Sequence, residues 1–279
     1  GLDVYEQEPL PEDHEFRSLE NLTLTPHLGA STEEAQESVG VEIAEAIAEV
    51  LQGGRIRNAI NMPSIDPKDL VTLKPYLELC MRLGAFARQA CQKTVQSLHI
   101  TYWGGMAEFD TIPLTRAVQK GWLKGIAGDE GVNDVNAPYK IKAMGIKVET
   151  TTSSSSVDYN ELIEVRTIDA DGKEQSVRGT IIGKNADPRI VEVDGESIEA
   201  RPVDTLLVVR NLDKPGIVGK VGTILGEFGV NIANMSLSRS EGSESALTIL
   251  ELDNEPSAEV LEKLVSHSDI QEARVSRQN

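Results

Sequence analysis

No run of apolar residues in this 279-residue chain approaches the roughly twenty that a membrane-spanning helix needs. Cysteine is scarce as well: the chain has Cys80 and Cys91, both within one predicted helix. About 16 Å of helix axis would separate them, at roughly 1.5 Å of rise per residue, which is too far for a disulfide. We therefore expect ordinary buried or half-buried thiols, a cytoplasmic location and no association with a membrane.

Basic residues are also few. The chain has 27 lysines and arginines against 45 aspartates and glutamates, a formal net charge of −18. So acidic a surface disfavours nucleic acid or an anionic membrane as a general partner, although it leaves room for a small local anion pocket. The composition, 39% hydrophobic and 26% charged, is typical of a globular protein, and the length suffices for roughly two domains.

Among the four histidines, His27 follows Glu8 by nineteen positions. An imidazole that titrates near neutrality can take a hydroxyl proton when a carboxylate orients it and stabilises its cationic form. The carboxylate also raises the pKa of the histidine, so the ring holds the proton more readily. The pair therefore suits acid–base chemistry on an alcohol or a carbonyl, although any surface loop can carry one glutamate and one histidine without a catalytic role.

The first part of the chain ends in a long predicted helix. Ser31-Thr32-Glu33-Glu34 has the spacing of a capping box, which predicts a helix start at this point. Apolar residues then recur at near-helical spacing up to Leu51, and Gly53-Gly54 supplies a stop. We expect residues 55–62 to be extended and residues 63–67 to be a linker, so that a first region spans residues 1–63.

Residues 64–203 are predicted to form a second, α+β unit. Two Asp-Gly pairs, at 171–172 and 194–195, lie between β-prone runs and predict hairpins. The serine run 153–156 is predicted to be a loop. The expected helices are 66–91, 112–126 and 137–144, and the expected strands are 98–103, 161–167, 175–182, 190–193 and 197–201.

Residues 204–279 show the strand and helix order βαββαβ of a ferredoxin-like sandwich. The predicted strands are 205–209, 231–237, 246–252 and 270–275, and the predicted helices are 215–228 and 257–267. Two helices would cover one face of the sheet and leave the other face or an edge open to a partner.

Two groups of polar residues suit small charged ligands. A turn from Asn211 to Gly216, with Asp213 in it, ends the first of these strands and starts a helix, and Asn231 is expected beside it. Helix-start amides, asparagine side chains and a carboxylate together suit a zwitterionic amino acid, but Asp213 could equally cap the helix and Asn231 shape a turn. Arg189 and Arg201 can clamp a phosphate or carboxylate, or equally form surface ion pairs with Asp187, Glu192 or Glu199.

The strings LDVYEQEP and TPHLGAST resemble the D-2-hydroxyacid dehydrogenase family, and within it the phosphoglycerate dehydrogenases. The resemblance implies an NAD-dependent oxidation of 3-phosphoglycerate to 3-phosphohydroxypyruvate in serine synthesis, without a metal. His27 would be the base and Glu8 its partner. Asp3 would contact the nicotinamide end of NAD, beside the loop of His27, Leu28, Gly29 and Ala30.

Two parts of that family's site are missing from the sequence. The phosphate-binding string G-x-G-x-x-G occurs nowhere in the 279 residues, and the arginine that grips the substrate carboxylate lies upstream of Asp3 in the family. The sequence is therefore interpreted as the C-terminal part of the enzyme, which begins in the remnant of a Rossmann-type α/β region and is inactive alone.

The string LLVVRNLDKPGIVGKVGTILGEFGVNIANMSLSR resembles an ACT domain, a regulatory module that often binds amino acids where two copies pair. The resemblance implies that Asn211, Asp213 and Asn231 bind L-serine; other members carry histidine or tyrosine at the position of Asn211. Residues 64–203 resemble the intervening, allosteric substrate-binding domain, where Arg189 and Arg201 would hold an anion. A homo-oligomer, dimer or tetramer, is expected through these two domains, and the alternative is an amino-acid-binding regulatory module without catalysis.

Overall fold

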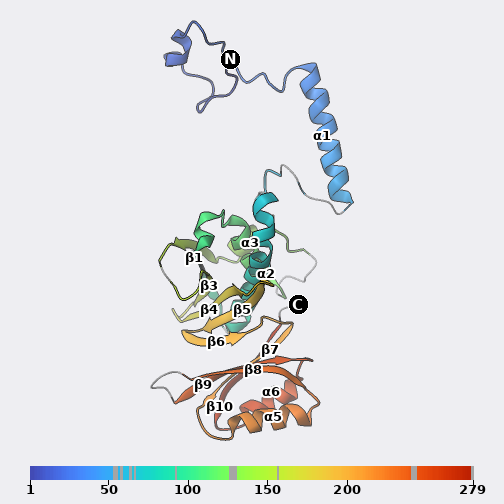
Figure 1. Ribbon diagram of the computed structural model, residues 1–279, viewed down its shortest axis with the longest axis vertical. Coiled ribbons are helices and arrows are strands. Elements are labelled where there is room, and N and C mark those ends of the chain that lie inside the picture. Colours follow the sequence, from blue (N-terminus) through green and yellow to red (C-terminus); the bar gives the residue numbers. More distant parts are fainter. Residues whose placement is uncertain are drawn as a thin grey trace. The chain divides into compact units, whose positions relative to one another are not determined.

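The computed structural model describes residues 1–52, 56, 59–62, 65, 67–91, 93–125, 131–155, 157–239 and 244–277 (Figure 1). It separates into two units, Gly1–Ile60 and Asn61–Asn279, and each is described by itself. Within the described residues, no helix has the length and apolar character that crossing a membrane would require.

The first unit contains the short 3-10 helix η1 (Glu15–Ser18) and the long helix α1 (Glu33–Leu51). The predicted helix is confirmed, but its cap is not the predicted one. Thr32, rather than Ser31, is the N-cap, and its hydroxyl accepts a hydrogen bond from the amide of Ala35 at 3.2 Å. No reciprocal capping box forms, because the third residue after Thr32 is an alanine without a side-chain acceptor.

The segment after α1 is only partly described. The predicted helix stop at Gly53-Gly54 lies outside the described residues, and so does most of the predicted extended return and linker, namely residues 55, 57, 58, 63, 64 and 66. Residues 59–62, which are described, contain no strand. Apolar side chains of α1, such as Val39, Ile43 and Ile47, are exposed within this unit.

The second unit starts with a six-stranded sheet and the helices that cover one face of it (Figure 1). The strand order is β2-β1-β3-β4-β5-β6, with β1 and β2 parallel and all other pairs antiparallel. The elements are α2 (Pro67–Ala90), β1 (Val95–Gly104), the 3-10 helix η2 (Gly105–Glu108), α3 (Ile112–Leu123), α4 (Ala137–Ala143), β2 (Lys147–Ser153), β3 (Glu161–Asp169), β4 (Glu174–Ile182), β5 (Asp187–Val193) and β6 (Glu196–Ala200).

Most of these elements were predictable, and β2 is the exception. Both predicted Asp-Gly hairpins form, β3–β4 and β5–β6, and Asp194 and Gly195 both have positive φ, as a two-residue hairpin turn requires. Strand β2 was not predicted because its sequence, KVETTTS, contains a single large apolar residue. It forms an edge of the sheet and pairs only with β1, so it does not need two apolar faces.

Helices α2 and α3 cross at two glycines, which let their backbones approach closely above the sheet. A Cβ atom on Gly121 would lie 1.8 Å from the carbonyl oxygen of Met81, and one on Gly84 would lie 2.1 Å from that of Val118. The side chains of Leu79, Leu83 and Trp122 are buried around this crossing. Larger residues at the two glycines would therefore push the helices apart.

The rest of the second unit is the predicted ferredoxin-like βαββαβ sandwich. Its elements are β7 (Thr205–Leu212), α5 (Ile217–Glu227), β8 (Ile232–Arg239), β9 (Ser245–Leu252), α6 (Ala258–Val265) and β10 (Ile270–Arg277). The sheet is antiparallel in the order β10-β7-β9-β8, and α5 and α6 cover one face of it (Figure 1). Leu207, Val209 and Leu250 form the core beneath these helices.

One of the predicted alternatives was an open second face of this sheet, but that face is covered. Leu206, Val208, Leu247 and Ile249 point away from α5 and α6 and join the core that contains α2, α3 and the six-stranded sheet. The chain itself therefore covers that face. The strand β8 lies at the end of the sheet, and within the described residues no strand is hydrogen-bonded to its outer edge.

We predict that Gly121→Ala lowers the free energy of unfolding of the chain by about 1–3 kcal/mol, because the added methyl group overlaps the backbone of α2. Gly219→Ala is the matched control. Gly219 lies in α5 with nothing within 4 Å of its added Cβ, so alanine should be neutral or stabilise the helix by up to about 1 kcal/mol. Urea unfolding followed by circular dichroism measures both, and equal effects would contradict the close crossing.

Candidate functional site

Backbone pairing between the start of the chain and residues 23–27 builds the first candidate site. The amide of Leu2 donates to the oxygen of Thr23 at 2.9 Å, the amide of Thr25 donates back to Leu2 at 3.0 Å, and the amide of His27 donates to the oxygen of Asp3 at 2.9 Å. These bonds bring the segment that contains Asp3 beside the loop that contains His27.

Asp3 then fixes the conformation of that loop. One carboxylate oxygen accepts from the hydroxyl of Thr25 at 2.6 Å and from the amide of Leu28 at 2.7 Å, and the other accepts from the amide of Gly29 at 2.6 Å. The Thr25 hydrogen bond and then the Leu28 amide lower the pKa of Asp3. These bonds surround His27, whose φ of 56° lies in the left-handed region. The carboxylate therefore holds the histidine in a conformation that is unusual for this residue type.

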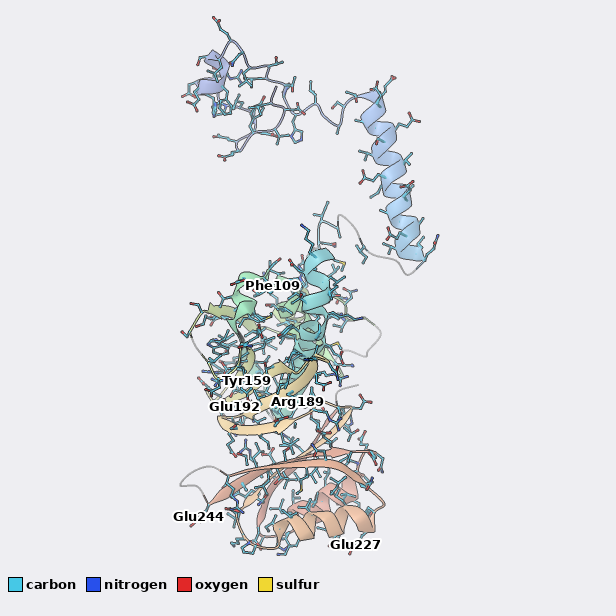
Figure 2. The ribbon with its side chains drawn as sticks, in the orientation of Figure 1. Phe109, Tyr159, Arg189, Glu192, Glu227 and Glu244 are labelled. Carbon is cyan, nitrogen blue, oxygen red and sulfur yellow. The ribbon has the colours of Figure 1, made fainter. Side chains whose placement is uncertain are left out.

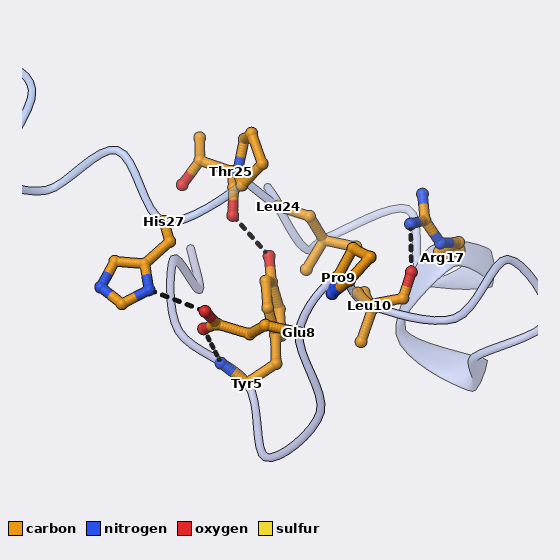
Figure 3. Close-up of a pocket in the computed structure, with 9 residues that line it drawn as sticks. Tyr5, Glu8, Pro9, Leu10, Arg17, Leu24, Thr25 and His27 are labelled. Atoms are coloured by element: carbon orange, nitrogen blue, oxygen red, sulfur yellow. Dashed lines mark hydrogen bonds and ion pairs between the residues drawn. The ribbon is translucent and has the colours of Figure 1, made fainter.

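Glu8 and His27 meet as the sequence predicts. His27 Nδ1 lies 2.8 Å from one carboxylate oxygen of Glu8, and the other oxygen accepts from the amide of Tyr5 at 3.0 Å (Figure 3). The hydrogen bond with Glu8 raises the pKa of His27, and the same bond lowers the pKa of Glu8. The second ring nitrogen of His27, Nε2, has no hydrogen-bond partner among the described residues, so it is available to a ligand.

The pair lines a pocket of about 550 Å³ whose wall is otherwise largely apolar (Figure 3). Pro9, Leu10, Leu24 and Pro26 contribute to that wall. Arg17, which the sequence did not single out, also lines the pocket and donates to the backbone oxygens of Leu10 at 2.7 Å and Pro11 at 2.8 Å. The arrangement combines an apolar hollow with a histidine that a carboxylate has oriented, which suits proton transfer to or from a small polar substrate.

The loop fits only one end of a dinucleotide. The amides of Leu28 and Gly29 already donate to Asp3, and the oxygen of Ala30 accepts from the side chain of Gln36 at 3.4 Å. No glycine-rich phosphate-binding string exists in the sequence. The residues present can therefore border the nicotinamide ring of the dinucleotide, but they do not supply a binding site for its phosphates.

Asn211 and Asp213 lie at the end of β7 and in the turn that follows it. Asn211 is buried, its amide nitrogen donates to the oxygen of Leu212 at 2.7 Å, and its side-chain oxygen is buried without a partner among the described residues. Asp213 lies 3.3 Å from the guanidinium of Arg239. One alternative was that Asp213 caps α5. The N-cap is instead Gly216, with a φ of 94°.

Asn231 lies at the other end of the same sheet, which corrects the expectation that it lies beside this turn. Leu212 pairs with Ser245 at one end of β9, whereas Ile232 pairs with Leu252 at the other. At roughly 3.3 Å per residue, about 20 Å of strand separates Asn211 from Asn231. The amide nitrogen of Asn231 instead donates to Asp253 at 2.6 Å. The three predicted effector residues are therefore not assembled within a single chain.

Arg189 and Arg201 border one pocket of about 330 Å³, together with Arg82, but both form ion pairs. Arg189, which is labelled in Figure 2, lies 3.3 Å from Glu199, one of the predicted alternatives. Arg201 donates through Nε at 3.0 Å and Nη2 at 2.7 Å to the carboxylate of Glu251, which is 2% exposed. Burial alone would raise the pKa of Glu251, but the hydrogen bonds, chiefly from Arg201, outweigh it and lower that pKa.

Comparisons with known proteins cover all parts of the chain. Residues 72–194 match the family model of the D-3-phosphoglycerate dehydrogenase intervening domain, residues 205–268 match the ACT domain, and residues 1–29 match the NAD binding domain of the D-isomer specific 2-hydroxyacid dehydrogenases. A D-3-phosphoglycerate dehydrogenase of Methanocaldococcus jannaschii is 38% identical over 99% of this chain and 51% of its own length. Along nearly all of its length, the chain is similar to the D-3-phosphoglycerate dehydrogenase family.

Other members of the family give the same result. The D-3-phosphoglycerate dehydrogenases of Synechocystis and Bacillus subtilis are 38% and 33% identical, over 98% and 97% of this chain and 49% and 51% of their own lengths. The chain thus spans about half the length of the curated relatives that it matches. The predicted family, the ACT domain and the remnant of an NAD-binding region are confirmed by these matches.

Several residues of these sites carried no recognisable signal in the sequence. Tyr5 supports Glu8 through its backbone amide, and Glu251 and Asp253 hold Arg201 and Asn231. Glu251 lies in the strand sequence SALTILEL, and its only sequence signal is that it is the one charged residue there. Asp253 and Arg82 resemble ordinary surface residues in sequence.

We predict that Glu8→Gln lowers the pKa of His27 toward its ordinary value, because the negative partner that stabilises the protonated ring is lost. A titration of the four histidine rings by NMR measures this change directly on the 279-residue chain. Glu12→Gln serves as the control for a general charge effect. An unchanged His27 titration in Glu8→Gln would contradict the pairing.

Proposed function

We propose that the chain is the C-terminal portion of an NAD-dependent D-3-phosphoglycerate dehydrogenase, which oxidises 3-phosphoglycerate to 3-phosphohydroxypyruvate in the first step of L-serine biosynthesis. The observation that carries the proposal is the 2.8 Å contact between His27 and Glu8, in a chain similar to this family, with no partner for His27 Nε2 among the described residues. We propose a division into residues 1–63 from the catalytic region, 64–203 as the intervening domain and 204–279 as the ACT domain, in a cytoplasmic enzyme.

The chemistry follows from the state of the histidine. His27 is a base when neutral, and Nε2 takes the proton of the substrate's C2 hydroxyl while the C–H bond of the same carbon breaks. NAD, when bound beside this loop, would supply the hydride acceptor that the conversion of the alcohol to a ketone requires. The imidazolium that forms is stabilised by Glu8, whose carboxylate lies on the other ring nitrogen.

Asp3 contributes to this reaction by positioning. Its two oxygens are bound to Thr25, Leu28 and Gly29, so it sets where the loop of His27, Leu28, Gly29 and Ala30 lies against the nicotinamide. Because the carboxylate has two oxygens that accept three hydrogen bonds, it fixes the loop more firmly than a neutral side chain would. The loop thereby fixes the position of His27 Nε2, and it is the part of this chain that would border the nicotinamide.

We predict that the 279-residue chain alone does not reduce NAD with 3-phosphoglycerate, because no phosphate-binding string is present in it. Activity should appear when the chain is joined to the part of the Methanocaldococcus relative that it does not match. In that fusion His27→Ala should lower kcat by about 10²–10⁴-fold, since a positioned base is lost. His14→Ala is the control. Near-normal turnover of the His27 variant would show that His27 is not the catalytic base.

We propose that L-serine binds between two copies of the ACT domain. The strand β8 forms an edge of its sheet, and antiparallel pairing of two β8 strands would set the start of one beside the end of the other. Asn231 precedes β8, and Arg239 at the end of β8 contacts Asp213. A pair of chains would thus bring Asn231 of one copy to Asn211 and Asp213 of the other, which supports a homodimer or a larger homo-oligomer.

Mixing two variants tests this shared site. Asp213→Ala and Asn231→Ala should each abolish the calorimetric heat of L-serine binding when they are alone. After the two variants are unfolded and refolded together, each mixed pair should contain one intact site, because one chain supplies Asp213 and the other supplies Asn231. Binding should therefore return in the mixture. If the mixture shows no more heat of L-serine binding than either variant alone, the three residues do not form a shared site between two chains.

A second candidate function is an amino-acid-binding regulatory module without catalysis. The observation that favours it is that residues 61–279 form a compact unit of their own. Calorimetric binding of L-serine by this chain would fit both proposals, whereas the turnover of the fusion protein fits only the enzyme. An anion at Arg189 and Arg201 would have to compete with Glu199 and Glu251 in either case.

A further inference from the structure

Asp253 holds the side chain of Asn231 in one orientation. The residue follows β9, and its carboxylate accepts from the amide nitrogen of Asn231 at 2.6 Å, while its own backbone amide donates to the oxygen of Asn231 at 3.2 Å. An ionised carboxylate can only accept hydrogen bonds. The nitrogen of the Asn231 amide must therefore face Asp253, and the oxygen must face away from it.

This orientation decides what Asn231 offers to a ligand. Both residues are exposed within one chain, so without Asp253 the amide of Asn231 could turn and present either its nitrogen or its oxygen. An outward oxygen accepts hydrogen bonds from an ammonium group, whereas an outward nitrogen would suit a carboxylate. The contact with Asp253 thus selects the acceptor.

Asn211 is oriented in the same sense by an independent contact. Its amide nitrogen donates to the backbone oxygen of Leu212, and its side-chain oxygen is buried with no partner among the described residues. Asp213 adds a carboxylate, and the guanidinium of Arg239 lies 3.3 Å from it. The residues proposed to bind the effector therefore present acceptors, as an ammonium group requires, and leave the effector's carboxylate to Arg239 or to backbone amides.

We propose that Asp253 is a positioning residue that fixes the amide polarity of Asn231, so that the effector site selects ligands with an ammonium group. The inference rests on the proposed L-serine site, and it adds the residue that determines the specificity of that site. Asp253 acts through Asn231 and does not itself contact the effector.

Calorimetry on the full 279-residue chain tests the proposal with three variants. Asp253→Ala should weaken L-serine binding by about tenfold, the effect of one hydrogen bond to a charged group. Asp253→Asn should bind L-serine nearly as well as the wild type, because its amide oxygen still accepts from Asn231. Glu259→Ala, which removes an exposed carboxylate from the first turn of α6, is the control for net charge and should bind like the wild type.

A second ligand separates positioning from a general structural effect. 3-Hydroxypropanoate is L-serine without its amino group, so the wild type should bind it much more weakly than L-serine. In Asp253→Ala the ratio of the two affinities should fall, because the freed amide can turn its nitrogen to the ligand. A purely structural defect would weaken both ligands alike and leave that ratio unchanged.

The outcomes separate this inference from the proposed function. Absence of L-serine binding by the wild type would remove the effector site, and with it the role of Asp253. Wild-type binding together with an unchanged affinity in Asp253→Ala, or an unchanged ligand ratio, would overturn the inference alone. If Asp253→Asn binds L-serine as weakly as Asp253→Ala while its thermal unfolding matches the wild type, the requirement for an acceptor at this position is also overturned.

Discussion

Carboxylates accept hydrogen bonds and cannot donate them, and in this acidic chain that constraint orients the polar groups of each candidate site. Asp3 collects a hydroxyl and two amides and so holds the loop of His27. Glu8 takes one nitrogen of the imidazole and leaves the other to a ligand. At the other end of the chain, Asp253 takes the nitrogen of Asn231 and leaves its oxygen. For His27 and Asn231, a fixed acceptor thus decides which atom of the side chain is left for a ligand.

The buried carboxylate of Glu251 extends this principle to the junction of the two sheets. It binds the backbone and the guanidinium of Arg201, which follows β6, and it accepts from Asn234 of β8 at 3.0 Å. The segment that leaves the six-stranded sheet is thereby tied to the edge strand of the ACT sheet. Because the apolar face of the ACT sheet also packs into the neighbouring core, the intervening and ACT regions share one interface with both polar and apolar contacts.

The two ends of the chain differ in how complete their sites are. The imidazole and carboxylate pair is assembled by local backbone bonds within thirty residues, so a short segment contains its full geometry. The residues that we propose to bind the effector, in contrast, are divided between opposite ends of one sheet, because the antiparallel register of β7, β9 and β8 separates them. In the proposed serine site, a second copy would supply the residue that a single register cannot.

The sequence by itself determined those features that arise from neighbouring residues. Apolar periodicity predicted α1, Asp-Gly pairs predicted both hairpins, and the alternation of strand and helix patterns predicted the ferredoxin-like order. Only the tertiary structure decided features that depend on partners distant in sequence. Strand β2 is an edge strand with little apolar signal, the face of the ACT sheet is covered by another part of the chain, and Asn231 is separated from Asp213 by strand register. Local patterns record which groups a segment must bury, whereas the register and the packing between sheets determine which of those groups meet.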